Sequence, residues 1–305
     1  MKGERLVQTM ILAAVGLALF GVIRPDSPDP QEDAVSHKTW FFINKTHQGP
    51  DYTAVIIGDS RALRGVSPGE MTAELDGTKI FNFSFHAGGM NEEMYQEGEK
   101  LIADGMAQPV IVLAPTALSF LPSKAANSQF HEYRNKPRDL VWIYRHWPGL
   151  AFWFQPVSPS IYIQKSIGYQ PAKILFQDFQ ADGWIATDQD PRDDLADLSL
   201  HRARLVGLKV DEARIRELMQ QTRQWSDRGF RVFGFFPPAY GPRVVQEDSM
   251  LGFDKDAFVQ SFRSAGGTWL DLDDPALESY DGSHLDRASA VNLSRALARG
   301  IAPFL

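Results

Sequence analysis

The sequence predicts an α/β fold in which a mainly parallel sheet of about five strands is covered by helices on both faces. Apolar segments of strand length alternate along the chain with amphipathic, capped segments of helix length. The strand candidates are continuously apolar, which is typical of strands buried on both faces. Such alternation favours parallel strands joined by helices, and active sites in these sheets lie at the carboxyl ends of the strands.

The first part of the alternation contains three strands and two helices. Residues 52–58 (YTAVIIG) form a continuous apolar run suited to the first strand. Ser67, Pro68 and Glu70 supply the N-cap, first and third positions of a capping box, which predicts a helix that runs to about Leu75. The following segments are predicted as a second strand at 79–85, a helix at 92–103 and a third strand at 110–113.

The alternation returns in the C-terminal part of the chain. Asp211 is placed to cap a helix with one apolar face, and Gly229 is placed to end it. Asp286 is placed to cap a last helix that ends at Gly300. Between these two helices we expect a fourth strand at 230–236, a helix at about 257–264 and a short fifth strand at 269–272.

Residues from about 121 to 200 break the alternation and are interpreted as an insertion, or as a cover over the edge of the sheet. This stretch contains four of the seven Trp residues. Its aromatic cluster consists of Trp142, Tyr144, Trp147, Phe152, Trp153 and Phe154. Two interpretations stay open, since the cluster could bind a sugar or a protein partner, or could pack against the domain.

The N-terminal residues predict a membrane anchor. Residues 7–23 are apolar except for Gln8 and Thr9, and as a helix they would reach roughly 26 Å, against a bilayer core of about 30 Å. Lys2 and Arg5 precede this run and acidic residues follow it, which favours an orientation with the rest of the chain outside the cytoplasm.

The chain is therefore expected to have three parts. These are a transmembrane anchor at 1–24, a tether at 25–50 that begins with a Pro- and Asp-rich stretch, and a domain at 51–305. A cleaved signal peptide and a buried core helix are the alternatives to the anchor.

Composition excludes several kinds of chemistry. The chain has no Cys, which removes disulfides, thiolate catalysis and Cys-ligated metal sites. A formal net charge of -7 disfavours nucleic-acid binding, which relies on a Lys- and Arg-rich surface. No GxxxxGKS or GxGxxG phosphate loop occurs. The chemistry is expected to use Ser, His, Asp, Glu and backbone groups, with no cofactor and no metal.

A candidate nucleophile follows the first strand in the motif Gly58-Asp59-Ser60. A Ser at a strand-to-helix turn holds its hydroxyl at the carboxyl edge of the sheet, beside the unpaired N–H groups of the helix N-terminus. This is where an acyl-transfer nucleophile and its first oxyanion donor are needed. The alternative is that Ser60 only caps the following helix.

A candidate acid–base pair lies near the C-terminus in the motif Asp281-Gly282-Ser283-His284. An Asp three residues before a His can accept the proton on imidazole Nδ1, which leaves Nε2 free to act as a base towards a Ser. The alternative is a polar turn that leads into the last helix.

Together the two motifs resemble those of the SGNH/GDSL hydrolase superfamily, over roughly residues 51–120 and 205–305. The resemblance implies a three-layer α/β/α, flavodoxin-like fold and serine esterase or acyl-esterase activity. It also implies that Ser60 is the nucleophile, that His284 is the general base and acid, and that Asp281 orients His284.

The resemblance implies that a backbone N–H after the second strand stabilises the oxyanion, and Gly88 or Gly89 stands in that position. The superfamily commonly has Gly-x-Asn-Asp after its third strand, where this chain has LAPTA at 113–117. The missing Asn leaves the third oxyanion contact open, and the loss of one such donor costs about 3 kcal/mol. The residues that could replace it are Asn82, Asn91 and Thr116.

Two further residues near the motifs have two interpretations each. Arg61, directly after the candidate nucleophile, either holds an anionic group or forms a surface ion pair. His86, beside the candidate oxyanion glycines, either contacts substrate or is satisfied within its loop.

The implied protein is a membrane-anchored, outward-facing enzyme that acts on O-acyl esters, in particular O-acetyl esters, with a cell-surface polysaccharide as the expected substrate. The missing Asn and the predicted anchor are similar to the membrane-tethered branch that acts in alginate O-acetylation and teichoic-acid D-alanylation. An O-acyltransferase is one alternative. A catalytically weak binding or assembly subunit beside a membrane acyl-carrier protein is another.

Overall fold

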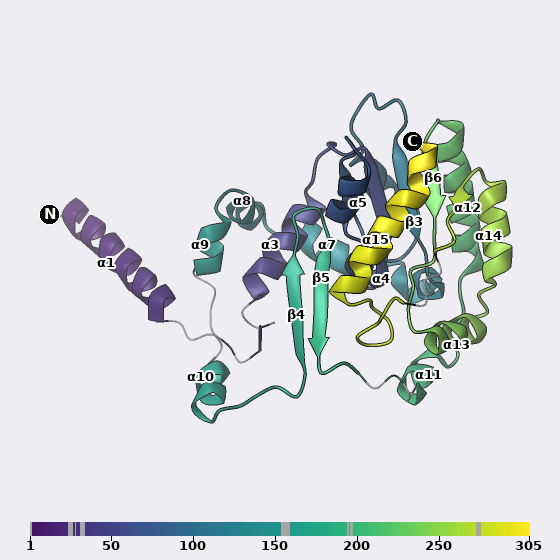
Figure 1. The fold of residues 1–305 in the computed structure, drawn as a ribbon. Helices are drawn as coiled ribbons and strands as arrows, with labels where there is room; N and C mark the ends of the chain where they lie inside the picture. The colour runs from purple at the N-terminus through teal and green to yellow at the C-terminus, as the bar shows by residue number, and fades with distance from the viewer. Residues whose placement is uncertain are drawn as a thin grey trace.

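Figure 1 shows the computed structural model, in which helices flank a central sheet. The structure describes residues 2–23, 27, 29–30, 34–153, 159–193, 195, 198–272 and 276–305. Helix α1 (Lys2–Ile23) projects from the rest of the chain, whereas the C-terminal helix α15 (Arg287–Ile301) packs along the sheet.

The sheet has five parallel strands in the order β2-β1-β3-β6-β7. The strands are β1 (Ala54–Gly58), β2 (Ile80–Asn82), β3 (Val110–Ala114), β6 (Arg231–Gly234) and β7 (Thr268–Trp269). The order places the first strand between the second and the third, as in flavodoxin-type sheets. The predicted five-stranded, mainly parallel sheet is confirmed.

Two hydrophobic cores, one on each face of the sheet, give the fold its three layers. Val55 and Ile57 of β1 face one core, whereas Ala54 and Ile56 face the other, because successive side chains of a strand point to opposite faces. The first core is covered by α3 (Val35–Thr46), α6 (Glu92–Glu99), α12 (Glu212–Asp227) and α14 (Lys255–Ser264). The second is covered by α4 (Ser60–Gly65), α5 (Pro68–Glu74) and α15.

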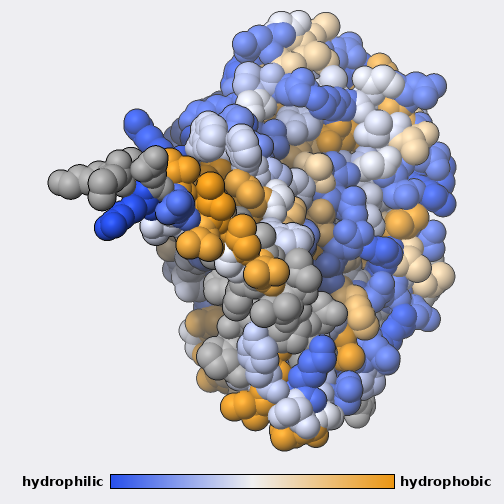
Figure 2. All heavy atoms as spheres, turned by 90° about the vertical axis from the view of Figure 1, so that its left-hand side faces the viewer, coloured by the Kyte–Doolittle hydropathy of each residue, from blue (hydrophilic) through white to orange (hydrophobic). Residues whose placement is uncertain are grey.

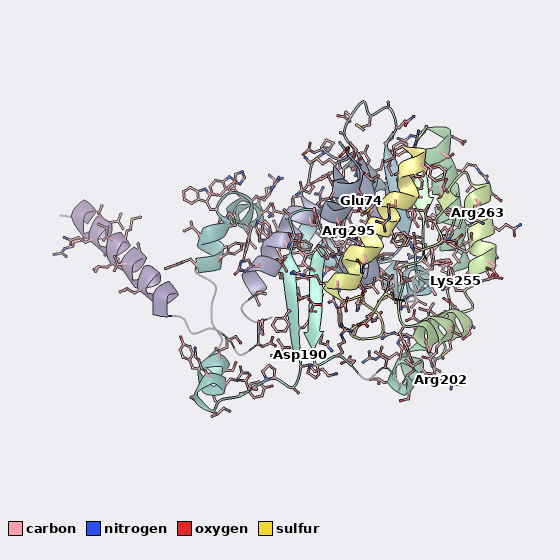
Figure 3. The ribbon with its side chains drawn as sticks, viewed as in Figure 1. Glu74, Asp190, Arg202, Lys255, Arg263 and Arg295 are labelled. Atoms are coloured by element: carbon pink, nitrogen blue, oxygen red, sulfur yellow. The ribbon has the colours of Figure 1, made fainter. Side chains whose placement is uncertain are left out.

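Several helices begin at the caps that the sequence predicts. The side chain of Ser67 accepts the N–H of Glu70 at the start of α5, and Asp211 and Asp286 cap α12 and α15 in the same way. Helices α5 and α15 face each other, and two ion pairs, Arg295–Glu70 and Arg299–Glu74, join their exposed sides. Figure 3 labels one residue of each pair, Arg295 and Glu74. Exposed pairs of this kind add at most about 1 kcal/mol each, so the buried apolar faces hold the layers together.

The segment expected as a tether is partly structured. Helix α3 covers residues 35–46, and its side chains Phe41, Phe42 and Ile43 are buried in the first core. The expectation of a tether over the whole of 25–50 is therefore wrong for α3, because three large apolar side chains in succession gain more by burial than by solvation. Residues 24–26, 28 and 31–33, within or next to the Pro- and Asp-rich stretch, lie outside the described residues.

Helix α1 coincides with the segment predicted as an anchor. Its described apolar side chains are exposed, and Figure 2, which looks onto this side of the molecule, shows hydrophobic atoms gathered there. In the described part of the chain, no helix combines the length and the apolar character that a membrane span requires. The predicted transmembrane anchor is therefore not supported.

The stretch at 121–200 contains short helices and an antiparallel hairpin. Its elements are η2 (Pro122–Lys124), α7 (Ser128–Arg134), α8 (Arg138–His146), α9 (Pro148–Trp153), α10 (Pro159–Ser166), β4 (Ile174–Phe179), β5 (Ile185–Asp190) and α11 (Ser199–Leu205), after η1 (Ala117–Phe120). The hairpin turn lies against β2, where Asn82 N–H donates to Asp182 O at 2.9 Å. Buried Lys45 of α3 donates to Gly183 O in the same turn.

In the aromatic cluster at 142–154, some side chains are exposed and others pack against the domain. Trp142, Trp147 and Trp153 are exposed, whereas Phe152 stacks on His37 of α3. Phe154 lies outside the described residues. Two elements outside this stretch complete the fold, α13 (Gly241–Leu251) and η3 (Ala302–Phe304).

Candidate active site

Ser60 stands at the turn from β1 into α4. Asp59 is the N-cap of this helix, since its Oδ1 accepts the N–H of Arg61 at 2.9 Å. The alternative role of Ser60 as the cap is thereby excluded, and Ser60 is the first residue of the helix. Its own N–H has no acceptor within the helix and lies at the positive end of the helix dipole.

Gly58 allows the close packing behind this turn. A Cβ at this position would lie 2.7 Å from Ala62 Cβ and 3.0 Å from Ala114 O. Strand β1 and helix α4 therefore meet at a separation that only glycine tolerates, and this contact fixes where Ser60 emerges from the sheet.

Ser60, His284 and Asp281 form one hydrogen-bonded chain. His284 Nε2 lies 2.9 Å from Ser60 Oγ, and His284 Nδ1 lies 2.7 Å from Asp281 Oδ2. The second oxygen of Asp281 accepts the backbone N–H groups of Ser283 and His284 at 2.9 and 2.7 Å. These bonds fold the Asp281–His284 loop back on itself and hold the imidazole towards Ser60.

The charges of the pair suit a general base near neutral pH. Burial lowers the pKa of His284, which outweighs the opposite effect of its hydrogen bond with Asp281. Burial opposes ionisation of Asp281, but hydrogen bonding to His284 and the backbone N–H groups lowers its pKa to about 2. The pair thus holds an ionised carboxylate next to an imidazole that is neutral at pH 7.

Thr116 forms a hydrogen bond to the turn that contains Ser60. Its hydroxyl donates to Asp59 Oδ2 at 2.5 Å, and the Ser119 hydroxyl donates to the same oxygen at 2.9 Å. Thr116 also caps η1. After β3, where an Asn donor is common in the superfamily, this chain thus has Thr116. The hydroxyl of Thr116 already donates to the carboxylate of Asp59.

The other proposed oxyanion donors have intramolecular acceptors. Gly88 N–H donates to Phe85 O at 3.1 Å, and Gly89 N–H donates to Asn127 Oδ1 at 3.2 Å. The side chain of Asn91 caps α6 and donates to Ala125 O at 3.2 Å. In this structure, each of these candidate donors therefore has an acceptor within the protein.

The side-chain amide of Asn82 also has acceptors within the protein. Its amide nitrogen donates to Ala62 O and Val66 O at 2.8 Å, so it joins the end of β2 to α4. The loop that follows β2 nevertheless stays close to β1, because Phe85 N–H donates to Gly58 O and a Cβ on Gly88 would lie 3.2 Å from the same oxygen. Of the two candidate glycines, Gly88 is thus the one whose Cα lies close to the end of β1.

The sequence did not indicate two residues that surround His284. The ring of Tyr280 stacks on the imidazole, with centroids 6.0 Å apart, and the guanidinium of Arg64 donates to the Tyr280 hydroxyl. Arg64 is four residues after Ser60, so helical spacing could have placed it on the same face as the nucleophile. Tyr280 has no comparable local pattern.

Arg61 is buried and His86 is half-buried. Arg61 Nη2 lies 2.7 Å from both carboxylate oxygens of Glu247, so the expected surface pair is a buried one. Burial, followed by the charge of Arg64, lowers the pKa of His86 well below its ordinary value. Its backbone N–H donates to the side chain of Gln129.

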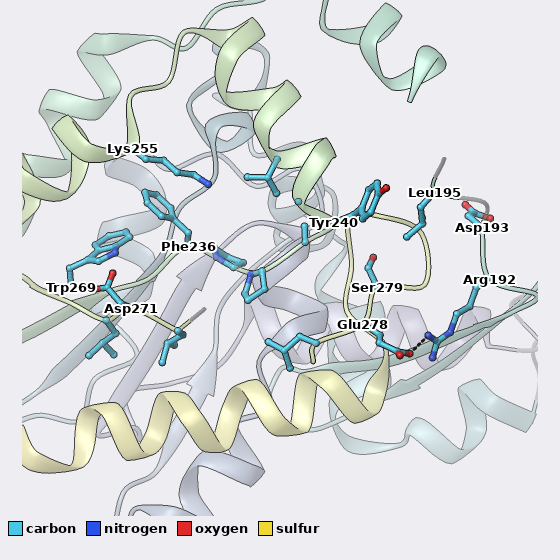
Figure 4. A pocket seen from close by; sticks show the side chains of 18 residues that line it. Arg192, Asp193, Leu195, Phe236, Tyr240, Lys255, Trp269, Asp271, Glu278 and Ser279 are labelled. Atoms are coloured by element: carbon cyan, nitrogen blue, oxygen red, sulfur yellow. Dashed lines mark hydrogen bonds and ion pairs between the residues drawn. The ribbon is translucent and has the colours of Figure 1, made fainter. Parts of the chain in front are cut away.

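A pocket of about 800 Å³ lies beside the Asp281–His284 loop, at the carboxyl ends of β6 and β7 (Figure 4). Phe236, Trp269 and Tyr240 line it together with the Arg192–Glu278 ion pair. Ser60 and His284 are not part of its wall. In the described part of the chain, no group of three or more His, Asp or Glu residues is arranged to hold a metal ion.

The chain was compared with family models, curated proteins and solved structures. No family model matches the chain, and no curated protein matches it. A search of solved structures finds a protein described as a candidate platelet activating factor from Streptococcus pneumonia, with 9% sequence identity and a TM-score of 0.40. The match covers 88% of this chain and 92% of that chain.

Proposed function

We propose that this protein is a serine esterase, or a related acyl-transferring enzyme, with Ser60 as its nucleophile. The observation that carries the proposal is the hydrogen-bonded chain from Ser60 Oγ through His284 to Asp281. A nucleophile, a base within hydrogen-bond reach and a carboxylate that orients the base are the minimum set for acyl transfer.

The reaction follows from this geometry. Ser60 Oγ attacks the carbonyl carbon of the ester while His284 Nε2 takes the hydroxyl proton. The bond from that carbon to the alcohol oxygen then breaks, and His284 returns the proton to the departing oxygen. A water molecule or a sugar hydroxyl then attacks the acyl-enzyme with His284 again as base. The bond from the acyl carbon to Ser60 Oγ breaks, His284 returns the proton to Ser60, and the product is a free acid or a transferred ester.

The substrate and the compartment belong to the same proposal. We propose small O-acyl groups, in particular acetyl groups, on a cell-surface polysaccharide, with the domain outside the cytoplasm. The resemblance of the two sequence motifs supports this part. Protease treatment of intact cells tests the compartment, and protection of the whole domain would contradict it.

The central test compares the purified full-length protein with Ser60→Ala on p-nitrophenyl acetate and on an acetylated polysaccharide, with acetate release as the measurement. We expect activity in the wild type and its loss in the variant. Equal activity in both proteins would show that Ser60 is not the nucleophile.

One observation favours a second candidate, a catalytically weak binding or assembly subunit. The N–H groups of Gly88 and Gly89 and the hydroxyl of Thr116 all have acceptors within the protein. A folded wild-type protein that is inert towards both esters and a serine-directed phosphonate would favour this candidate.

A further inference from the structure

A buried ion pair, Arg61–Glu247, lies next to the Ser60 turn together with two partly buried side chains, Arg243 and His201. Glu247 on α13 is 1% exposed and contacts Arg61 Nη2 through both carboxylate oxygens at 2.7 Å. Arg243 Nε donates to Glu247 at 3.3 Å, and His201 Nε2 lies 3.0 Å from the same carboxylate, outside hydrogen-bond geometry. Burial opposes ionisation of Glu247, but His201 and Arg61 lower its pKa to about 2.

The two arginines that contact Glu247 also connect to Ser60 and to the loop that carries His284. Arg61 directly follows Ser60, and its Nε donates to Ser283 Oγ at 3.3 Å. Arg243 donates through Nη1 to the backbone carbonyl of Asp281 at 3.1 Å. A single carboxylate therefore holds one guanidinium next to the nucleophile and another on the loop of the base.

Helix α13 supports the same loop through its backbone. Tyr240 N–H, at the start of this helix, donates to Gly282 O at 3.2 Å. Gly282 has a positive φ of 78°, and a Cβ there would lie 3.2 Å from Leu195 and 3.6 Å from Arg243. The loop thus turns tightly against α13, and the position of its His284 depends on that contact.

We propose that Glu247 is a positioning residue that sets the separation of Ser60 Oγ and His284 Nε2. The proposal rests on the esterase function proposed above. Glu247 touches neither reacting group and acts through Arg61 and Arg243. A merely stabilising ion pair is the alternative, and a buried pair often contributes little net stability because both charges lose their hydration.

The test uses Glu247→Gln, which keeps the shape of the side chain but removes its charge. Glu99→Gln is the matched control. Glu99 also accepts from an arginine, Arg228, at 2.6 Å and from Trp225 at 2.7 Å, but it lies on α6 and joins this helix to the C-terminal end of α12. The measurements are the rate of Ser60 labelling by a fluorophosphonate, kcat and KM for p-nitrophenyl acetate, and the midpoint of thermal unfolding.

We expect Glu247→Gln to lower the labelling rate and kcat by about 10- to 100-fold while KM changes less than about twofold, because a misplaced catalytic group slows chemistry more than binding. Glu99→Gln is expected to lower the midpoint without slowing the labelling. Wild-type labelling in a folded Glu247→Gln protein would overturn the proposal.

A second variant covers the case in which Glu247→Gln does not fold. Arg243→Met removes the hydrogen bond to Asp281 O at a partly exposed position, where the loss of stability is expected to be smaller. We expect slower labelling in the same direction. A folded Arg243→Met protein with the wild-type rate would overturn the proposal.

Crystal structures separate a failure of this proposal from a failure of the proposed esterase function. If the wild type reacts with neither reagent, the esterase function fails, but the distance between Ser60 Oγ and His284 Nε2 can still be compared. An increase from 2.9 Å to beyond hydrogen-bond reach in the Glu247 or Arg243 variant supports the positioning role. An unchanged distance overturns it.

Discussion

Asp59 Oδ2 accepts a hydrogen bond of 2.5 Å from the hydroxyl of Thr116, which joins the residue before the proposed nucleophile to the loop after β3. Its other oxygen caps α4 through the N–H of Arg61. One buried carboxylate therefore ties together two neighbouring strand ends at the edge of the sheet where the site lies.

Replacement of this carboxylate by an amide is expected to destabilise the turn. In Asp59→Asn the amide nitrogen cannot accept the hydroxyl protons of Thr116 and Ser119, so the free energy of unfolding should fall by about 1–3 kcal/mol. Urea denaturation measures the change. Asp51→Asn, at an exposed ion pair with Lys79, is the control and should stay within about 0.5 kcal/mol of the wild type.

Ser60 and His284 are expected to act as one unit. Ser60→Ala or His284→Ala should each lower kcat on p-nitrophenyl acetate by at least about 10³-fold, and the double variant should be no slower than either single variant by more than about tenfold. Steady-state kinetics of the three proteins measures this. Multiplicative losses in the double variant would contradict a shared mechanism.

The pH dependence of kcat/KM is expected to report His284. Because burial lowers the pKa of this imidazole, the neutral form persists to a pH below the ordinary value of 6.5, and activity should fall on the acid side only below that pH. A pH–rate profile of the free enzyme measures the midpoint. A midpoint clearly above 6.5 would contradict this assignment.

Gly58 is expected to tolerate no side chain. Gly58→Ala would place a Cβ 2.7 Å from Ala62 Cβ, so either β1 or α4 must shift, with a loss of about 1–3 kcal/mol in stability and of esterase activity. Gly49→Ala is the control, since a Cβ there has no atom within 4 Å. Thermal unfolding measures the stability of both variants, and the ester assay measures their activity.

Acid is expected to remove the contribution of ionised Glu247 to the free energy of unfolding. Its pKa is about 2 in the folded protein against an ordinary value of 4.5, so the unfolded state binds more protons between these values. The free energy of unfolding should therefore fall by on the order of 3 kcal/mol as the pH decreases from about 5 to 2. Glu247→Gln should lack this part of the acid dependence, which denaturation at several pH values measures.

Local patterns predicted much of the fold and the site. The caps Ser67, Asp211 and Asp286 act through hydrogen bonds to residues two or three positions away, so the sequence is sufficient to place them. The pair Ser60 and His284 lies 224 residues apart in sequence, and the parallel sheet brings both to the same edge.

Other features depend on packing between distant elements. Glu247, Arg243 and Tyr280 acquire their roles because α13 lies against the Asp281–His284 loop, and no local spacing indicates this contact. The hydrogen bonds of Gly88 and Gly89 likewise depend on how the loop after β2 folds. Helix α3 could have been indicated by its apolar run at 40–43, which is unlike the Pro- and Asp-rich composition before it.

The hairpin turn that lies against β2 also affects whether two copies of this protein can pair through the edge of the sheet. An open outer strand offers unpaired backbone groups to a second chain and so favours aggregation. Here the N–H of Asn82 is already bonded to Asp182 O, while the opposite border strand, β7, is only two residues long. The sheet is thereby protected at both borders, and loss of the turn around Asp182 and Gly183 would open one of them to intermolecular pairing.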